Sequence, residues 1–193
     1  KVVAQDLCIR LNKKVFRTRR KEDWRWISKE ILEESARELK MDKHIVKDAV
    51  NAVDRGVMDQ LIWSLSNKFY PGEDKVKKTL ADVIRGFARQ GKVIIVGRGG
   101  VSLTRDIKKS LHIELIAPIE WRAEVVSERQ QIPFDKAVKK CREIDCQREN
   151  LRAFFEKQKP GLEQFDVVLN YKTMTSNEIL EVILKILEMR QMV

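Results

Sequence analysis

The run Lys92–Gly100, KVIIVGRGG, constrains the fold more than any other part of the chain. Four consecutive β-branched residues at positions 93–96 are followed directly by Gly-Arg-Gly-Gly. A short, unbroken apolar run that stops at glycine is typical of a parallel strand buried on both faces. We therefore predict a central buried strand over 93–96, with a glycine-rich turn at its carboxyl end.

This turn, formed by Gly97, Arg98, Gly99 and Gly100, is the first candidate site. Ligands of open α/β sheets bind outside the carboxyl ends of the strands, and glycine leaves backbone N–H groups accessible to a phosphate. The guanidinium of Arg98 adds a forked donor for an anion. Two interpretations stay open at this point, an anion-binding turn and an ordinary strand-to-loop turn with a solvated arginine.

Length and charge narrow the class of protein. A chain of 193 residues suits one ordinary domain with its own core. The formal charge of +10 favours polyanionic partners, which include nucleotides, nucleic acid and acidic lipid, and charge alone does not choose among them.

Three cysteines, Cys8, Cys141 and Cys146, form no Cys-x-x-Cys pair. An odd number of cysteines without paired spacing argues against a zinc site or a disulfide framework. It favours a protein of the reducing cytoplasm. No apolar run approaches the roughly 20 residues of a membrane span, and no signal peptide is visible.

Hydrophobic periodicity predicts alternating helices and strands along the chain. Helices are predicted over 1–11, 24–40, 42–53, 54–69, 73–90, 101–108, 119–129, 133–157 and 175–189, and further strands over 111–116 and 165–169. Val15-Phe16 is predicted as a short edge strand, and His112 as a core or edge histidine rather than a catalytic base. Because strand and helix alternate through the second half, we expect βαβ units and a parallel sheet, hence an α/β fold.

We expect one domain over 1–193, and its parts are predicted as a helical lobe at 24–69, central strands with the glycine turn at 92–129, a helix at 133–159, and a last strand and closing helix at 165–193.

The helix that begins at Pro133 carries the second candidate site, in CREIDCQRENLRAFF. Asp145, Arg148 and Arg152 are spaced three and four residues apart, so they share one helix face, and Arg142 precedes them. Guanidinium forks along one face suit the clamping of phosphates, and Asp145 can hold a fork when no ligand is bound. The alternative is a surface ladder of salt bridges, which spacing alone favours because such ladders are common.

Four segments in the same order resemble the cytidylate kinase-like family of P-loop nucleoside-monophosphate kinases: IIVGRGG, LHIELIAPIEWRAEVVSER, REIDCQRENLRAFF and FDVVLNYKTMT. The resemblance covers roughly 92–187, and 24–39 more loosely. It implies a core of about five parallel strands, a helical lobe that binds the acceptor nucleotide, and a helical lid that carries arginines.

The resemblance also implies roles for individual residues. The turn Gly97-Arg98-Gly99 resembles the turn that receives the acceptor phosphate. Arg148 and Arg152 resemble the lid arginines that close on the transferred phosphoryl group, Asp145 resembles the lid aspartate, and Arg142 is a further candidate for substrate binding.

The sequence also departs from the family pattern. It contains no GxxxxGK[ST] loop, and Lys1–Leu11 resembles the helix that follows that loop. We therefore expect the donor loop to precede Lys1, which would lie beside the donor nucleotide. Ser28 stands where the family tends to have an acceptor-binding aspartate, and Gly99 replaces an acidic residue of bacterial cytidylate kinases, so cytidine specificity is not carried over.

The expected function is ATP-dependent phosphoryl transfer, with Mg²⁺, to a nucleoside monophosphate or a similar small phosphorylated acceptor. Nucleotides are the expected partners, and neither a membrane nor nucleic acid is. The alternative is a non-catalytic nucleotide- or RNA-binding protein that retains the kinase fold without a donor loop.

Overall fold

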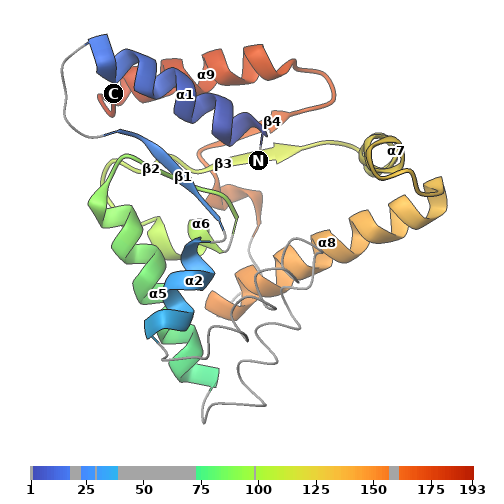
Figure 1. The fold of residues 1–193 in the computed structure, drawn as a ribbon, viewed down its shortest axis with the longest axis horizontal. Helices are drawn as coiled ribbons and strands as arrows, with labels where there is room; N and C mark the ends of the chain where they lie inside the picture. Colours follow the sequence, from blue (N-terminus) through green and yellow to red (C-terminus); the bar gives the residue numbers. More distant parts are fainter. Residues whose placement is uncertain (1, 18–22, 29, 39–72, 98, 157–160) are drawn as a thin grey trace.

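Figure 1 shows the computed structural model of the chain, which describes residues 2–17, 23–28, 30–38, 73–97, 99–156 and 161–193. Short strands alternate with helices through the described residues. In chain order the elements are α1 (Val2–Arg17), β1 (Arg25–Ile27), α2 (Glu30–Glu38), α5 (Glu73–Gln90), β2 (Val93–Ile95), α6 (Gly100–Thr104), β3 (Ile113–Ile116), α7 (Ile119–Gln130), α8 (Phe134–Phe155), a 3₁₀ turn (Leu162–Gln164), β4 (Val167–Asn170) and α9 (Ser176–Met189). The prediction of a mixed α/β chain is confirmed.

The strands form two parallel pairs. β1 pairs with β2 so that Ile27 lies opposite Ile95, and β3 pairs with β4 so that Leu115 lies opposite Leu169. The parallel direction agrees with the prediction from alternating strands and helices. Within the described residues these are two separate two-stranded sheets, so the predicted five-stranded sheet is not confirmed.

The predicted helix over 24–40 is wrong in its first turn, because residues 25–27 form β1. The side chain of Ile27 fits the periodicity of the following helix, yet its backbone pairs with β2, and the N–H of Val96 donates to the carbonyl of Ile27 at 3.0 Å. Helix α2 begins only at Glu30, whose carboxylate accepts a 2.8 Å hydrogen bond from the N–H of Ser28. The helices predicted over 42–53 and 54–69 lie outside the described residues.

The predicted edge strand at Val15-Phe16 is also wrong, because α1 continues through it to Arg17. Once a helix is formed, each added residue gains a backbone hydrogen bond without a new nucleation cost. The side chain of Asn12 on α1 bonds both backbone groups of Trp24, its Nδ2 donating to the carbonyl at 2.9 Å and its Oδ1 accepting from the N–H at 2.6 Å. The helix is thereby attached to the residue that precedes β1.

The strands are less buried than the sequence predicts. The three residues of β2 are half-buried, and in β3 Leu115 and Ile116 are 37% and 41% exposed. A strand is buried on both faces only where helices cover both. In Figure 1, α1 and α9 lie side by side over β3 and β4, and Leu7, Leu11 and Leu169 share a core with Ile179 and Ile183.

Helix α8 runs from α7 at one side of the molecule toward α5 (Figure 1). Near its start, Ala137 and Cys141 pack on Ala123 of α7. Near its end, Leu151 is buried in the core that contains Ile84 of α5. The predicted helix from Pro133 is confirmed, and so are the helices predicted over 73–90, 119–129 and 175–189 to within two residues.

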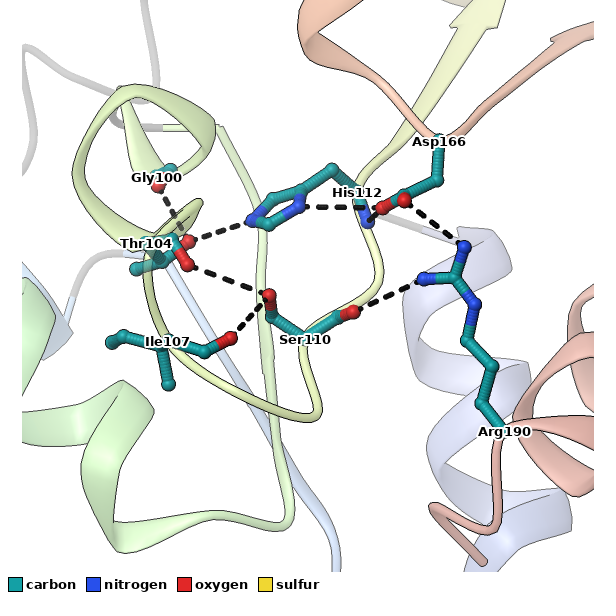
Figure 2. A network of polar contacts seen from close by, with 7 residues as sticks. All are labelled: Gly100, Thr104, Ile107, Ser110, His112, Asp166 and Arg190. Atoms are coloured by element: carbon teal, nitrogen blue, oxygen red, sulfur yellow. Dashed lines mark hydrogen bonds and ion pairs between the residues drawn. The ribbon is translucent and has the colours of Figure 1, made fainter.

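His112, just before β3, joins a polar network that Figure 2 shows. Its Nε2 lies 2.9 Å from Oγ1 of Thr104, and its backbone N–H donates to Oδ2 of Asp166 at 2.7 Å. Arg190, after α9, donates to Oδ1 of Asp166 at 3.0 Å and to the carbonyl of Ser110 at 3.3 Å. The network therefore links α6, the residues that directly precede β3 and β4, and the end of the last helix.

Among the residues that the structure describes, no helix combines the length and the apolar character needed to cross a membrane.

Candidate functional site

The turn after β2 has the backbone that its glycines predict. Gly97 and Gly99 have φ values of +70° and +67°, and the N–H of Gly100 donates to the carbonyl of Gly97 at 3.0 Å. Glycine adopts this left-handed region without the penalty that a β-carbon brings. Arg98, the predicted acceptor ligand, lies outside the described residues.

The turn packs directly against the last turns of α8. A β-carbon added to Gly99 would lie 2.7 Å from Cδ2 of Phe155 and 3.6 Å from the carbonyl oxygen of Leu151. Two carbon atoms 2.7 Å apart overlap, so a larger residue at position 99 would force the Phe155 ring to shift, and packing as well as the backbone angle favours glycine there. The first candidate site is thereby brought next to the turn of α8 that carries Arg152.

Asp145, on the middle of α8, binds a guanidinium that the sequence analysis did not assign. Arg122 of α7 donates from Nη1 to Oδ1 at 2.8 Å and from Nη2 to Oδ2 at 2.7 Å. This is the two-pronged geometry in which arginine and carboxylate interact most strongly. Asp145 therefore does bind an arginine side chain, as expected, but that arginine is on α7 rather than on α8.

Arg148 makes a much weaker contact. Its Nη1 lies 3.6 Å from Oδ1 of Asp145, and its side chain is 65% exposed. The ladder of salt bridges predicted as the alternative is therefore present in part, as this one loose i,i+3 pair. Arg142, about one turn before Asp145 on α8, is exposed.

Arg152 faces the sheet. Its Nη1 lies 3.8 Å from Oε2 of Glu114 on β3, and its guanidinium lies 6.0 Å from the ring centre of Phe165. Its Nε is buried without a hydrogen-bond partner, as is the Nε of Arg122, so far as the described residues show. A buried donor without an acceptor is energetically costly.

Glu114 lies close to several of these charges. Burial raises the pKa of its carboxyl group, and although the positive charges of Arg152 and Arg148 lower that pKa, the net change is upward. We call Arg122, Arg148 and Arg152, together with Asp145 and Glu114, the arginine cluster. Three cationic and two anionic side chains leave the cluster with one excess positive charge when all five are ionised.

Two further residues, Ser28 and Lys1, were predicted as site residues. Ser28 is buried directly after β1, at the same end of its sheet as Gly97, and Lys1 lies outside the described residues. Two cluster residues were missed from the sequence. Glu114 could have been found, because a charged residue in the apolar strand LHIELI is unusual. Arg122 could not, because its sequence context is that of any arginine on a surface helix.

The described residues contain no group of three or more His, Cys, Asp or Glu side chains that could hold a metal ion. We therefore assign no metal ligand within the part of the chain that the structure describes.

Comparisons with known proteins identify the family and a similar fold. The sequence profile of the cytidylate kinase-like family matches residues 21–173 of the chain. The fold is similar to that of a solved structure described as an uncharacterized protein from Eubacterium ventriosum ATCC 27560, with a TM-score of 0.65 and 19% sequence identity, over 97% of this chain and 90% of that one. No curated protein matches the chain.

Proposed function

The chain belongs to the cytidylate kinase-like family, which indicates a nucleotide kinase at a coarse level, and we propose that it transfers the γ-phosphoryl group of ATP to a nucleoside monophosphate or a similar small phosphorylated acceptor. The proposal includes Mg²⁺ entering with the phosphates of ATP, nucleotides as partners, and a lid formed by α8. The observation that carries it is the arginine cluster, in which Arg152 of α8 pairs with Glu114 and lies one turn before Phe155, the residue that α8 packs against the glycine turn.

The chemistry of phosphoryl transfer suits these residues. The transition state is loose and spreads negative charge over the equatorial phosphoryl oxygens, so catalysis depends on positioning and on cationic groups. Arg148 is exposed and loosely paired, and Arg152 has a buried Nε without a partner in the described residues, so both can bind incoming oxygens. We assign the transition-state charge to these two arginines.

Asp145 and Arg122 have a different role in this proposal. Their two hydrogen bonds fix one face of α8 against α7, so that Arg148, one turn along, projects from a defined position. Positioning of this kind contributes to rate because the cationic groups need no reorganisation when the charge develops. Arg98, Gly97 and Gly99 are proposed to bind the acceptor phosphate. Arg142 and Ser28 are proposed as further acceptor-binding residues, and Lys1 as a donor-binding residue.

The experiment is an assay of ADP formation by the full-length protein with ATP and Mg²⁺, in the presence and absence of each common ribonucleoside and deoxyribonucleoside monophosphate. We expect ADP formation that depends on an acceptor, and the preferred acceptor identifies the substrate. Absence of acceptor-dependent ADP, together with nucleotide or RNA binding measured by calorimetry, would favour the non-catalytic binding protein instead.

A further inference from the structure

We infer that Glu114 is the internal counter-anion of Arg152 in the ligand-free protein, and that a phosphoryl group displaces it from the guanidinium on binding. The inference rests on the proposed function, because it specifies how the same site exchanges one anion for another. In this view Glu114 lowers the affinity of the site for phosphates and thereby favours their release.

The first argument is the direction in which Glu114 points. Side chains alternate along a strand, so Ile113 and Leu115 lie on the face opposite to Glu114. Ile113 packs against the core formed with α1 and α9. Glu114 therefore points to the other face of the sheet, where Arg152 of α8 is its ion-pair partner.

The second argument is the looseness of this ion pair. The 3.8 Å between Nη1 of Arg152 and Oε2 of Glu114 exceeds hydrogen-bond distance, whereas Asp145 accepts two hydrogen bonds of 2.7 and 2.8 Å from Arg122. No described residue donates a hydrogen bond to the carboxylate of Glu114. Its contact with Arg152 is therefore easily exchanged, while the Asp145 contact is a fixed part of the structure.

The third argument is what each anion offers to Arg152. Its buried Nε has no partner among the described residues, so Glu114 leaves part of the guanidinium unsatisfied. A phosphoryl group has three oxygens and can accept from Nε and from a terminal nitrogen at once. The incoming anion thus gains hydrogen bonds that the resident carboxylate does not make.

The fourth argument is electrostatic. Burial already raises the pKa of Glu114, which means that its surroundings disfavour the ionised form. A second anion beside Arg152 would repel the Glu114 carboxylate and compete with it for the same positive charge. Removing the negative charge at position 114 should therefore strengthen the binding of phosphates, whereas a merely structural residue would weaken binding when it is changed.

The test measures the affinity of inorganic pyrophosphate for the full-length protein by isothermal titration calorimetry at neutral pH. We expect Glu114→Gln to bind pyrophosphate about two to five times more tightly than the wild type, the range that corresponds to removing one modest charge interaction. Glu114→Asp, which keeps the charge, should bind no more tightly than the wild type. Glu114→Ala is a second neutral variant, judged by the same criterion if the glutamine variant does not fold.

Two controls separate this role from a change in net charge. Glu181→Gln removes the same charge from α9, where Glu181 accepts a 2.6 Å hydrogen bond from Arg10, and it should leave pyrophosphate affinity unchanged. In the background of Arg152→Ala, Glu114→Gln should no longer tighten binding. Circular dichroism confirms that each variant is folded.

The inference is overturned if folded Glu114→Gln and Glu114→Ala bind pyrophosphate no better than the wild type. It is also overturned if Glu181→Gln has the same effect, or if no form binds pyrophosphate. These outcomes differ from a failure of the proposed function. A protein that forms no ADP but binds pyrophosphate more tightly after Glu114→Gln would reject the kinase and retain Glu114 as the counter-anion.

Discussion

Arg122 and Asp145 are 23 residues apart on two different helices and share two hydrogen bonds of 2.8 and 2.7 Å. With the packing of Ala123 on Ala137, this pair makes α7 and α8 one unit. If α8 is a lid, α7 moves with it, and the arginines of α8 keep their spacing relative to Asp145 when the site closes.

The pair should contribute measurably to stability. Both side chains are about one-third exposed, so water screens their attraction, and we expect a coupling energy of about 1 kcal/mol. A double-mutant cycle with Arg122→Ala and Asp145→Ala, followed by urea denaturation, measures it. A coupling energy near zero would show that the two hydrogen bonds do not hold the helices together.

Arg148→Ala should separate activity from stability. Its side chain is 65% exposed and makes one loose ion pair, so the free energy of unfolding should change by less than about 0.5 kcal/mol. Loss of a transition-state cation should lower kcat by about 100-fold or more. Steady-state kinetics with ATP and the preferred acceptor test this, with Arg129→Ala at the exposed end of α7 as the matched control. An unchanged kcat would remove Arg148 from the catalytic group.

The two glycines of the turn should differ in their tolerance of alanine. Both have positive φ, so each substitution should cost about 1 kcal/mol from backbone strain. Gly97 has open space where a β-carbon would be added, whereas at Gly99 that carbon would meet the ring of Phe155 at 2.7 Å. We expect Gly99→Ala to cost a further 1–3 kcal/mol, roughly, because the packed ring has to shift. Urea denaturation of both variants provides the comparison, and equal losses would contradict it.

His112 should make stability depend on pH. Burial lowers the pKa of its imidazole below the usual 6.5, an effect that outweighs the charge of Asp166. The unfolded chain therefore binds a proton more readily than the folded protein, so the free energy of unfolding should fall as the pH drops below about 6.5. His112→Gln should cost about 1 kcal/mol above neutral pH and progressively less at lower pH.

Denaturation curves between about pH 7.5 and pH 5 measure this difference for the wild type and His112→Gln. A difference that stays constant over that range would show that His112 does not titrate differently in the folded and unfolded states.

Much of the local structure could be predicted from the sequence. Apolar periodicity placed α5, α7, α8 and α9 within two residues, because a helix that buries one face has its spacing written in the chain. The glycines at 97 and 99 marked a turn whose backbone angles other residues rarely adopt. Residues 25–27 were wrongly predicted as helix because three residues are too few to show a strand pattern. Their backbone pairing with β2 makes them a strand.

The sequence by itself determined which residues of α8 share a face and where the glycine turn lies, because both follow from the geometry of residues that are neighbours along the chain. Only the tertiary structure decided that Asp145 binds Arg122, that Arg152 faces Glu114, and that the glycine turn packs against Phe155. These contacts join residues 23 to 56 positions apart along the chain. The path of the backbone between two elements, which local periodicity does not encode, determines which side chains meet.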